Sequence, residues 1–221
     1  VQGRDFAFES RVAAVGGQQF TLQGLSGRYE DILLPLHGEF QANNAAIALA
    51  AVESLTGGRE LSIDAVREGF GAVTSPGRLE VVRRSPTIIV DAAHNPHGVQ
   101  AMVDSITSEF TFSPLIGVVG VMADKEAEEM LRILEPVLAH IICTENSTER
   151  SMSAADLTDM AGDIFGAERV TRADRLDDAL EQAIILADAG GEGFENAIGS
   201  GGVIITGSVI TAGEARTLLR V

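Results

Sequence analysis

The side chains best suited to chemistry lie in one short segment, from Asp91 to His97. Asp91 is the first polar residue after the apolar run 87–90, which is typical of a buried strand. A carboxylate at the end of such a strand can accept hydrogen bonds from ribose hydroxyls. His94 would lie beside the amino terminus of the next helix, where phosphate groups are favoured. The segment is therefore a candidate nucleotide site.

The same residues allow two other interpretations. Asp91 and Asn95 are also common turn and helix-cap residues, and the histidine between them could be incidental. His94 and His97 have the spacing of a metal-binding pair, but two ligands are too few and no Cys or further His lies nearby. The residues by themselves leave the turn-and-cap and nucleotide interpretations open, and they disfavour a metal.

Strands and helices alternate from about residue 76 to the end of the chain. Asp124 and Ser153 are expected to cap two of the helices. We expect strands at 87–90, 115–121, 140–143, 169–170 and 202–206, and helices at 95–110, 124–134, 153–165, 174–189 and 211–219. This alternation predicts an α/β fold with an open, mostly parallel, Rossmann-like sheet and helices on both faces. Ligands of such sheets meet the carboxyl ends of the strands, here the loops after Val90, Val121, Cys143 and Thr206.

Residues 1–75 have a different pattern. Strands are expected at 6–15, 19–25 and 31–36, and helices at 45–53 and 63–73, the second capped by Ser62. Three strands and two helices do not obviously close on themselves, so we interpret this part as the tail of a preceding domain. Ser75-Pro76-Gly77 marks the boundary. Because Val1 is not an initiator Met, we expect the chain to be cut from a longer one.

Composition excludes several classes of protein. The net charge is −16, from 32 acidic and 16 basic residues, and nucleic-acid binding needs a basic footprint that is missing. No apolar run is long enough to predict a membrane span, and we expect a cytoplasmic protein. The lone Cys143 cannot form an intramolecular disulfide and is expected in the core. The glycine-rich residues 190–202 lack a Gly-Lys-Ser/Thr ending, which favours a flexible connection over a phosphate loop.

Five segments occur in an order that resembles one enzyme family. They are residues 38–46 (Gly-Glu-Phe-Gln-Ala-Asn-Asn-Ala-Ala), 76–80 (Pro-Gly-Arg-Leu-Glu), 91–96 (Asp-Ala-Ala-His-Asn-Pro), 122–126 (Met-Ala-Asp-Lys-Glu) and 206–208 (Thr-Gly-Ser). In this order they resemble the folylpolyglutamate and dihydrofolate synthases, relatives of the Mur ligases of peptidoglycan synthesis. The resemblance implies that residues 1–75 end a central ATPase domain. It also implies that residues 76–221 form the carboxyl-terminal, glutamate-binding domain of the Mur ligase type.

The resemblance implies nucleotide contacts for four residues. Asn44 would contact adenine, Arg78 the phosphates, Asp91 the ribose, and His94 the γ-phosphate or the incoming glutamate. Catalytic roles would fall to His94 and Arg78, since a guanidinium suits phosphate oxygens. Asn44 as a helix N-cap and Arg78 as a solvated surface residue are the structural alternatives.

Glutamate contacts are implied for Ser208 and Lys125, together with His94. A cap or turn role for Ser208 remains open. Lys125 would stand at a helix start, where a cation opposes the helix dipole, and this slightly favours a functional role over a plain surface position.

The activity that the resemblance implies is ATP-dependent ligation of L-glutamate to folates through an acyl phosphate. ATP, folate and L-glutamate would be the ligands of a monomer, and Mg²⁺ would bridge the phosphates. The family's phosphate loop, magnesium ligands and modified lysine are not found in this chain, so we expect no metal ligands here and no ATP turnover by the chain alone. Another Mur-type amino-acid ligase, a dihydropteroate-specific ligase and a non-catalytic nucleotide-binding α/β module stay as alternatives.

Overall fold

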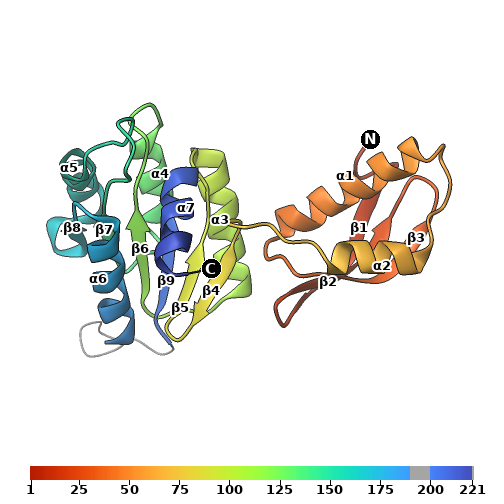
Figure 1. The fold of residues 1–221 in the computed structure, drawn as a ribbon, viewed down its shortest axis with the longest axis horizontal. Helices are drawn as coiled ribbons and strands as arrows, with labels where there is room; N and C mark the ends of the chain where they lie inside the picture. The colour runs from red at the N-terminus through yellow and green to blue at the C-terminus, as the bar shows by residue number, and fades with distance from the viewer. Residues whose placement is uncertain (190–199, 221) are drawn as a thin grey trace. The chain divides into compact units, whose positions relative to one another are not determined.

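The computed structural model describes residues 1–189 and 200–220 (Figure 1). It contains two compact units, an amino-terminal unit Val1–Pro76 and a carboxyl-terminal unit Gly77–Val221. The glycine-rich segment 190–202 falls outside the described residues as far as residue 199, so its predicted flexibility stays a prediction.

The amino-terminal unit is an antiparallel sheet covered by two helices. The strands are β1 (Ala7–Ala14), β2 (Gly17–Gln23) and β3 (Arg28–Leu34), in that order, and the helices are α1 (Glu39–Leu55) and α2 (Ile63–Gly71). Although closure was not evident from the sequence, these elements enclose a common core. That core consists of Phe20, Leu22, Tyr29, Ile32, Leu34, Ala42, Ala45, Ala46, Leu49 and Val66.

Helix α1 begins earlier than the sequence indicates. We expected it at residue 45, where the alanine-rich run starts, but it begins at Glu39 with Gly38 as N-cap. The N-cap interpretation of Asn44 is therefore wrong. Gly38 has φ 93°, a left-handed conformation that glycine adopts without strain.

The same unit contains a fully buried carboxylate. Glu53 accepts hydrogen bonds from the Tyr29 hydroxyl at 2.8 Å and from the Leu25 and Ser26 amides. The Tyr29 hydroxyl in turn accepts one from the Leu61 amide at 2.9 Å. Since a buried carboxylate is stable only when its oxygens are paired, these bonds join α1, β3 and the start of the α2 segment.

The carboxyl-terminal unit is a six-stranded, mostly parallel sheet, as the alternation predicts. Its strands are β4 (Glu80–Arg84), β5 (Thr87–Val90), β6 (Leu115–Val119), β7 (His140–Cys143), β8 (Val170–Arg172) and β9 (Gly202–Thr206). They lie in the order β4-β5-β9-β6-β7-β8, and only β4 is antiparallel to its neighbour. The sequence did not indicate β4, because this half-exposed, charged edge strand lacks the apolar run of a buried strand.

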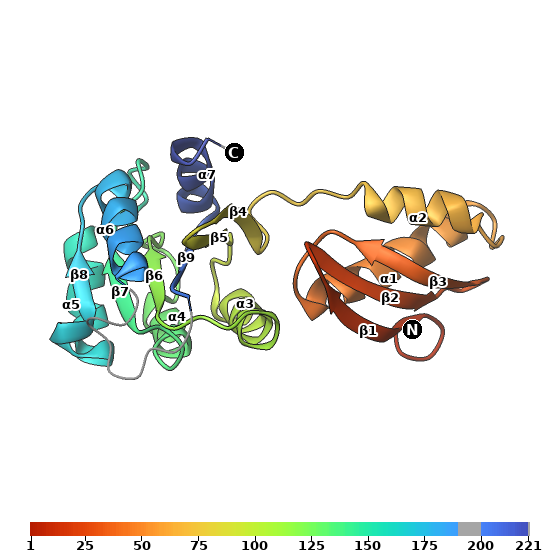
Figure 2. The ribbon, with the colours of Figure 1, turned by 90° about the horizontal axis from the view of Figure 1, so that it is seen from below.

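Helices cover both faces of this sheet (Figure 2). Helices α6 and α7 lie on one face, and α3, α4 and α5 on the other. Their bounds are α3 Pro96–Glu109, α4 Ala127–Leu134, α5 Ala154–Phe165, α6 Leu176–Asp188 and α7 Val209–Leu218, with a 3₁₀ turn η1 at Ala167–Arg169. The core under α6 and α7 combines β-branched strand residues with alanines of the helices.

Of the caps expected at Asp124 and Ser153, the one at Ser153 is confirmed. Ser153 precedes α5, and its hydroxyl accepts from the Asp156 amide at 3.1 Å. Asp124 does not cap α4, whose N-cap is Glu126. Its carboxylate is instead paired with Arg150 at 3.1 Å and with Lys125 at 3.4 Å.

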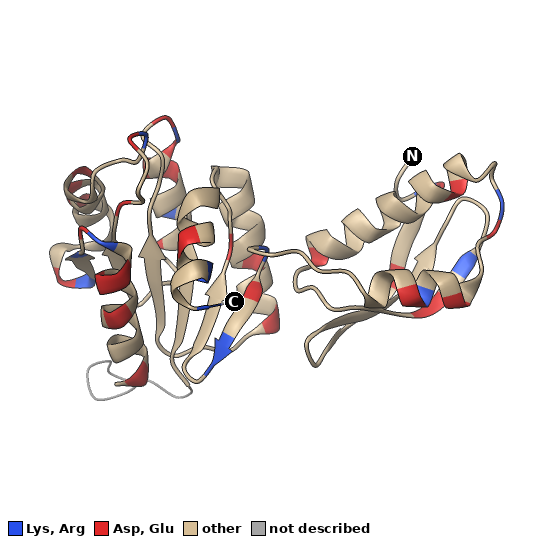
Figure 3. Ribbon diagram, in the orientation of Figure 1, with Lys and Arg blue, Asp and Glu red and all other residues tan. Residues whose placement is uncertain are grey.

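Acidic residues outnumber basic ones, and helix α6 carries Asp and Glu but neither Lys nor Arg (Figure 3). Within residues 1–189 and 200–220, no helix combines the length and apolarity that crossing a bilayer requires.

Cys143 is a core residue, as its apolar neighbours predict. It is fully buried at the end of β7, and its burial raises the pKa of the thiol from 9.0 to about 12. Because the thiolate is the reactive form, we expect an aromatic disulfide reagent at pH 8 to modify the folded chain roughly 1,000-fold more slowly than the urea-unfolded chain. Comparable rates in the two states would contradict the burial of this residue.

Candidate nucleotide and amino-acid site

The loops expected to carry the site leave the same edge of the sheet. Strands β5, β9, β6 and β7 are parallel neighbours, so their carboxyl ends lie together. Backbone hydrogen bonds join successive loops: the Gly207 amide donates to the Ala93 carbonyl at 3.1 Å, and the Gly120 amide to the Thr206 carbonyl at 3.1 Å. These loops are therefore joined along one edge of the sheet.

Asp91 follows β5 at this edge and is only 3% exposed. Its Oδ2 accepts from the Leu79 amide at 2.9 Å and its Oδ1 from the Ala93 amide at 2.8 Å. Burial raises its pKa, while these two hydrogen bonds and the charges of Arg78 and His94 act in the opposite direction. One carboxylate thus fixes the residue after Arg78 and the residue before His94.

These contacts agree with the turn interpretation of Asp91. Both oxygens already accept backbone hydrogens in this structure. The ribose contact implied by the resemblance remains a prediction.

Arg78 stands between two fixed residues. The Gly77 amide donates to the Glu80 carboxylate at 2.7 Å, and the Gly77 carbonyl accepts from the Ala92 amide at 2.8 Å. The Arg78 side chain is exposed, and it has no hydrogen bond or ion pair with any residue in the described part of the chain. A guanidinium without a protein partner on a fixed backbone is suited to bind an anion.

The backbone on either side of Arg78 is left-handed. Gly77 has φ 68°, which costs glycine nothing, and Leu79 has φ 45°, which costs a non-glycine residue about 1 kcal/mol. Leu79 keeps this conformation because its side chain is buried and its amide is bonded to Asp91.

His94 is half-buried and has a defined ring orientation. Its Nδ1 lies 2.9 Å from the Ala92 carbonyl oxygen. Since a carbonyl only accepts, Nδ1 carries a hydrogen, and Nε2 is left for another partner. Helix α3 starts beside it, but Asn95 accepts from the Gly98 amide at 2.8 Å and Pro96 has no N–H. A phosphate here would depend on side chains more than on helix amides.

Ser208 is the N-cap of α7 and is buried. Its hydroxyl accepts from the Thr211 amide at 2.9 Å, and the Asn146 side-chain amide lies 3.4 Å from the same oxygen. The cap interpretation of Ser208 is confirmed, and its glutamate contact stays a prediction.

Asn146 is a residue of the candidate site that sequence reasoning missed. Its Nδ2 also reaches the Thr211 hydroxyl at 3.3 Å, and Thr211 donates to the Gly120 carbonyl at 2.9 Å. The side chain thus joins the loops after β6, β7 and β9. Because ligands of parallel sheets bind at the carboxyl ends of the strands, the sequence did indicate the loop after Cys143. Nothing in that loop distinguished this asparagine from its polar neighbours.

Two further predicted site residues, Lys125 and Asn44, make their hydrogen bonds and ion pairs elsewhere within their own units. The half-exposed Lys125 ammonium is paired with Asp124 in the loop after β6. Asn44 is exposed on α1 of the other unit, where its side-chain amide donates to Gln41 at 3.1 Å. The structure therefore ties Arg78, Asp91, His94 and, through Gly207, Ser208 into one arrangement.

A cavity of about 690 Å³ opens where β7 and β8 end, beside α6 and α7. Its charged lining residues are one arginine and four acids: Arg175, Glu145, Asp174, Asp177 and Glu214. This charge disfavours an acidic ligand such as glutamate. Across residues 1–189 and 200–220, no group of three His, Cys, Asp or Glu is arranged to hold a metal ion.

Comparison with known families assigns this α/β unit to a class of ligases. Residues 77–208 match the Mur ligase, glutamate ligase domain, and the chain belongs to this family. Its resemblance to folylpolyglutamate and dihydrofolate synthases is confirmed as well. The chain is 48% identical over 220 residues to the dihydrofolate synthase/folylpolyglutamate synthase of Mycobacterium tuberculosis, covering 97% of this chain and 45% of that protein. It is 33% identical over 129 residues to the folylpolyglutamate synthase of Lacticaseibacillus casei, covering 58% of this chain and 30% of that protein.

Solved structures agree. The M. tuberculosis folylpolyglutamate synthase, solved in complex with ADP and AMPPCP, superposes with a TM-score of 0.94 at 47% identity, covering 99% of this chain and 48% of that one. The Thermotoga maritima folylpolyglutamate synthase gives 0.77 at 28% identity, covering 100% of this chain and 48% of that one. The chain spans about half the length of the relatives it matches.

Proposed function

We propose that this chain is the carboxyl-terminal part of an ATP-dependent ligase that adds L-glutamate to folates. The observation that carries the proposal is Asp91, whose one carboxylate holds the backbone beside both Arg78 and His94. Arg78 is left exposed without a partner among the described residues. The likeness to folylpolyglutamate synthases over nearly the whole chain supports the same assignment.

The reaction would proceed in two displacements. A carboxylate oxygen of the folate attacks the γ-phosphorus of ATP, and ADP leaves. The glutamate amine then attacks the acyl carbon, and phosphate leaves from the tetrahedral intermediate. The Arg78 guanidinium would bind phosphate oxygens and stabilise the charge that develops on them. His94 would offer Nε2 to the γ-phosphate or to the glutamate, because Nδ1 is held by Ala92.

The remaining contacts follow from the resemblance. Ser208 and Lys125 would hold glutamate, Asn44 the adenine, and Asp91 the ribose. Mg²⁺, when bound, would neutralise phosphate charge. As the resemblance implies, its ligands would belong to the amino-terminal part of the ligase rather than to this chain. A monomer acting in the cytoplasm goes with the proposal.

Phosphate release tests the proposal directly. We expect the full-length ligase to release phosphate from ATP only when both a folate and L-glutamate are present. The chain of residues 1–221 alone should give no turnover above the no-enzyme rate. Folate- and glutamate-dependent release by the isolated chain would refute the interpretation as a fragment.

The same assay separates the alternatives. Release with another amino acid in place of glutamate would indicate a different Mur-type ligase. Release with dihydropteroate but not with tetrahydrofolate would indicate a dihydropteroate-specific ligase. Nucleotide binding by the full-length protein without release under any combination would indicate a non-catalytic module.

A further inference from the structure

We propose that Glu80 and Arg216 are positioning residues that hold Arg78 toward the nucleotide phosphates. The inference rests on the proposed function, because it presumes that Arg78 binds those phosphates. It adds two residues to the site, and one of them lies on the last helix of the chain.

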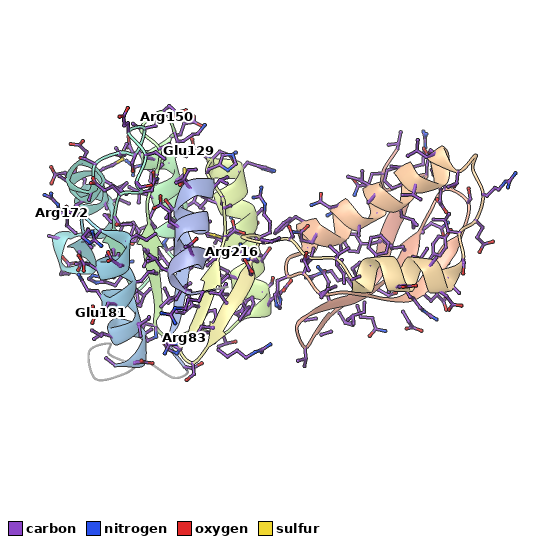
Figure 4. All side chains as sticks on the ribbon, in the orientation of Figure 1. Arg83, Glu129, Arg150, Arg172, Glu181 and Arg216 are labelled. Atoms are coloured by element: carbon purple, nitrogen blue, oxygen red, sulfur yellow. The ribbon has the colours of Figure 1, made fainter. Side chains whose placement is uncertain are left out.

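The contacts form a short chain from α7 to the segment before β4. Arg216 Nε donates to Glu80 Oε2 at 2.7 Å, and the same oxygen accepts from the Gly77 amide at 2.7 Å. Both side chains are largely buried, with exposures of 28% for Arg216 and 24% for Glu80. Figure 4 labels Arg216 on α7 beside β4. Because water and salt screen a partly buried ion pair less than an exposed one, the attraction between Arg216 and Glu80 is stronger than that of a surface pair.

Arg78 is thereby fixed from both sides. Glu80 holds the amide that precedes it, at Gly77, and Asp91 holds the amide that follows it, at Leu79. Since Leu79 is in a left-handed conformation, this turn depends on its hydrogen bonds to stay in place. Arg216 keeps the Glu80 carboxylate directed at Gly77; without it, that carboxylate is free to turn toward water. The Arg78 guanidinium would then sample a wider range of positions.

Helix α7 contacts two parts of the candidate site, the loop after β9 through Ser208 and the start of β4 through Arg216. Its first turn is capped by Ser208, and its last turn carries Arg216. Arg216 lies 136 positions beyond Glu80 in the chain, so sequence spacing gave no sign of the pair. Through this contact, α7 would support the segment that carries Arg78.

The test uses steady-state kinetics of the full-length ligase. Arg216→Met removes the charge and keeps the length of the side chain. Glu80→Gln removes the ion pair and keeps an oxygen for the Gly77 amide. We expect each to raise the KM for ATP about tenfold, because the contact with bound phosphate weakens, and to lower kcat to a smaller extent, because Arg78 would also stabilise charge that develops during transfer. Arg216→Lys should restore part of the loss.

A second ion pair of the same unit provides the control. Arg169 Nη1 lies 2.6 Å from Glu135, with side-chain exposures of 31% and 33%, at the opposite end of the strands. Glu135→Gln and Arg169→Met should lower the melting temperature and leave the KM for ATP unchanged. An equal rise in KM in these control variants would show a general loss of stability and overturn the inference.

The Arg78→Met variant distinguishes a failure of the positioning inference from a failure of the proposed function. If it raises the KM for ATP while Arg216→Met and Glu80→Gln do not, positioning is overturned and the proposed function stands. If Arg78→Met leaves both the KM for ATP and kcat unchanged, its phosphate contact fails and the positioning inference fails with it. Raised KM values in all three variants, with unaffected controls, support the inference.

Discussion

Asp91→Asn is expected to destabilise the carboxyl-terminal unit by about 2 kcal/mol and to lower kcat/KM for ATP in the full-length ligase by roughly 100-fold or more. An asparagine has one acceptor oxygen where two amides, of Leu79 and Ala93, need an acceptor each. The NH₂ group of the asparagine would face the amide N–H of Leu79 or Ala93, and that buried donor would lose its acceptor. The Arg78 and His94 loops would then lose their common support, and the effect on catalysis should exceed the effect on stability.

Urea unfolding of the isolated chain and steady-state kinetics of the full-length ligase measure the two effects. Asp104→Asn is the matched control, because Asp104 is exposed on α3 and its carboxylate, within the described part of the chain, accepts from Gln100 alone. If Asp91→Asn were as stable and as active as the parent, one acceptor oxygen would suffice. The account of Asp91 as the residue that organises the site would then be wrong.

Glu53→Ala is expected to destabilise the amino-terminal unit by about 3 kcal/mol. The change removes the acceptor of the buried Tyr29 hydroxyl and of the Leu25 and Ser26 amides, and it leaves a cavity. Tyr29 is the only tyrosine of a chain without tryptophan, so its fluorescence reports on this unit specifically.

The measurement is the urea midpoint from tyrosine fluorescence, compared with circular dichroism of the whole chain. Glu68→Ala on the exposed side of α2 is the control and should move neither midpoint appreciably. Equal shifts in the two glutamate variants would contradict the role of Glu53. A selective loss of the tyrosine transition, with the remaining signal unchanged, would show that the two units unfold separately.

The fold was largely predictable from periodicity. Apolar runs identified β5, β6, β7 and β9 because these strands are buried on both faces, and their order along the chain implied a parallel sheet. Edge strand β4 and the first turns of α1 were missed, since neither has a local pattern that differs from a loop. Glycine at the α1 N-cap gave no capping signal beyond a turn.

The candidate site was predictable only in part. Strand ends and the resemblance indicated Arg78, Asp91, His94 and Ser208, and the structure joins these four. Their partners could not be predicted, because Leu79, Glu80 and Arg216 meet them through the fold and not through spacing. A sequence can indicate that a carboxylate stands at the end of a strand, but it does not indicate which amides that carboxylate binds. Asp91 binds the amides of Leu79 and Ala93, and through them it holds the backbone beside Arg78 and His94.

The central claim is that Asp91 supports a turn from which Arg78 reaches the nucleotide phosphates. A crystal structure of the full-length ligase with a non-hydrolysable ATP analogue tests it most directly. We expect a guanidinium nitrogen of Arg78 about 3 Å from a phosphate oxygen, with Asp91 still bonded to the amides of Leu79 and Ala93. Phosphates bound with Arg78 remaining in solvent, or an Asp91 side chain turned away from both amides, would contradict the account.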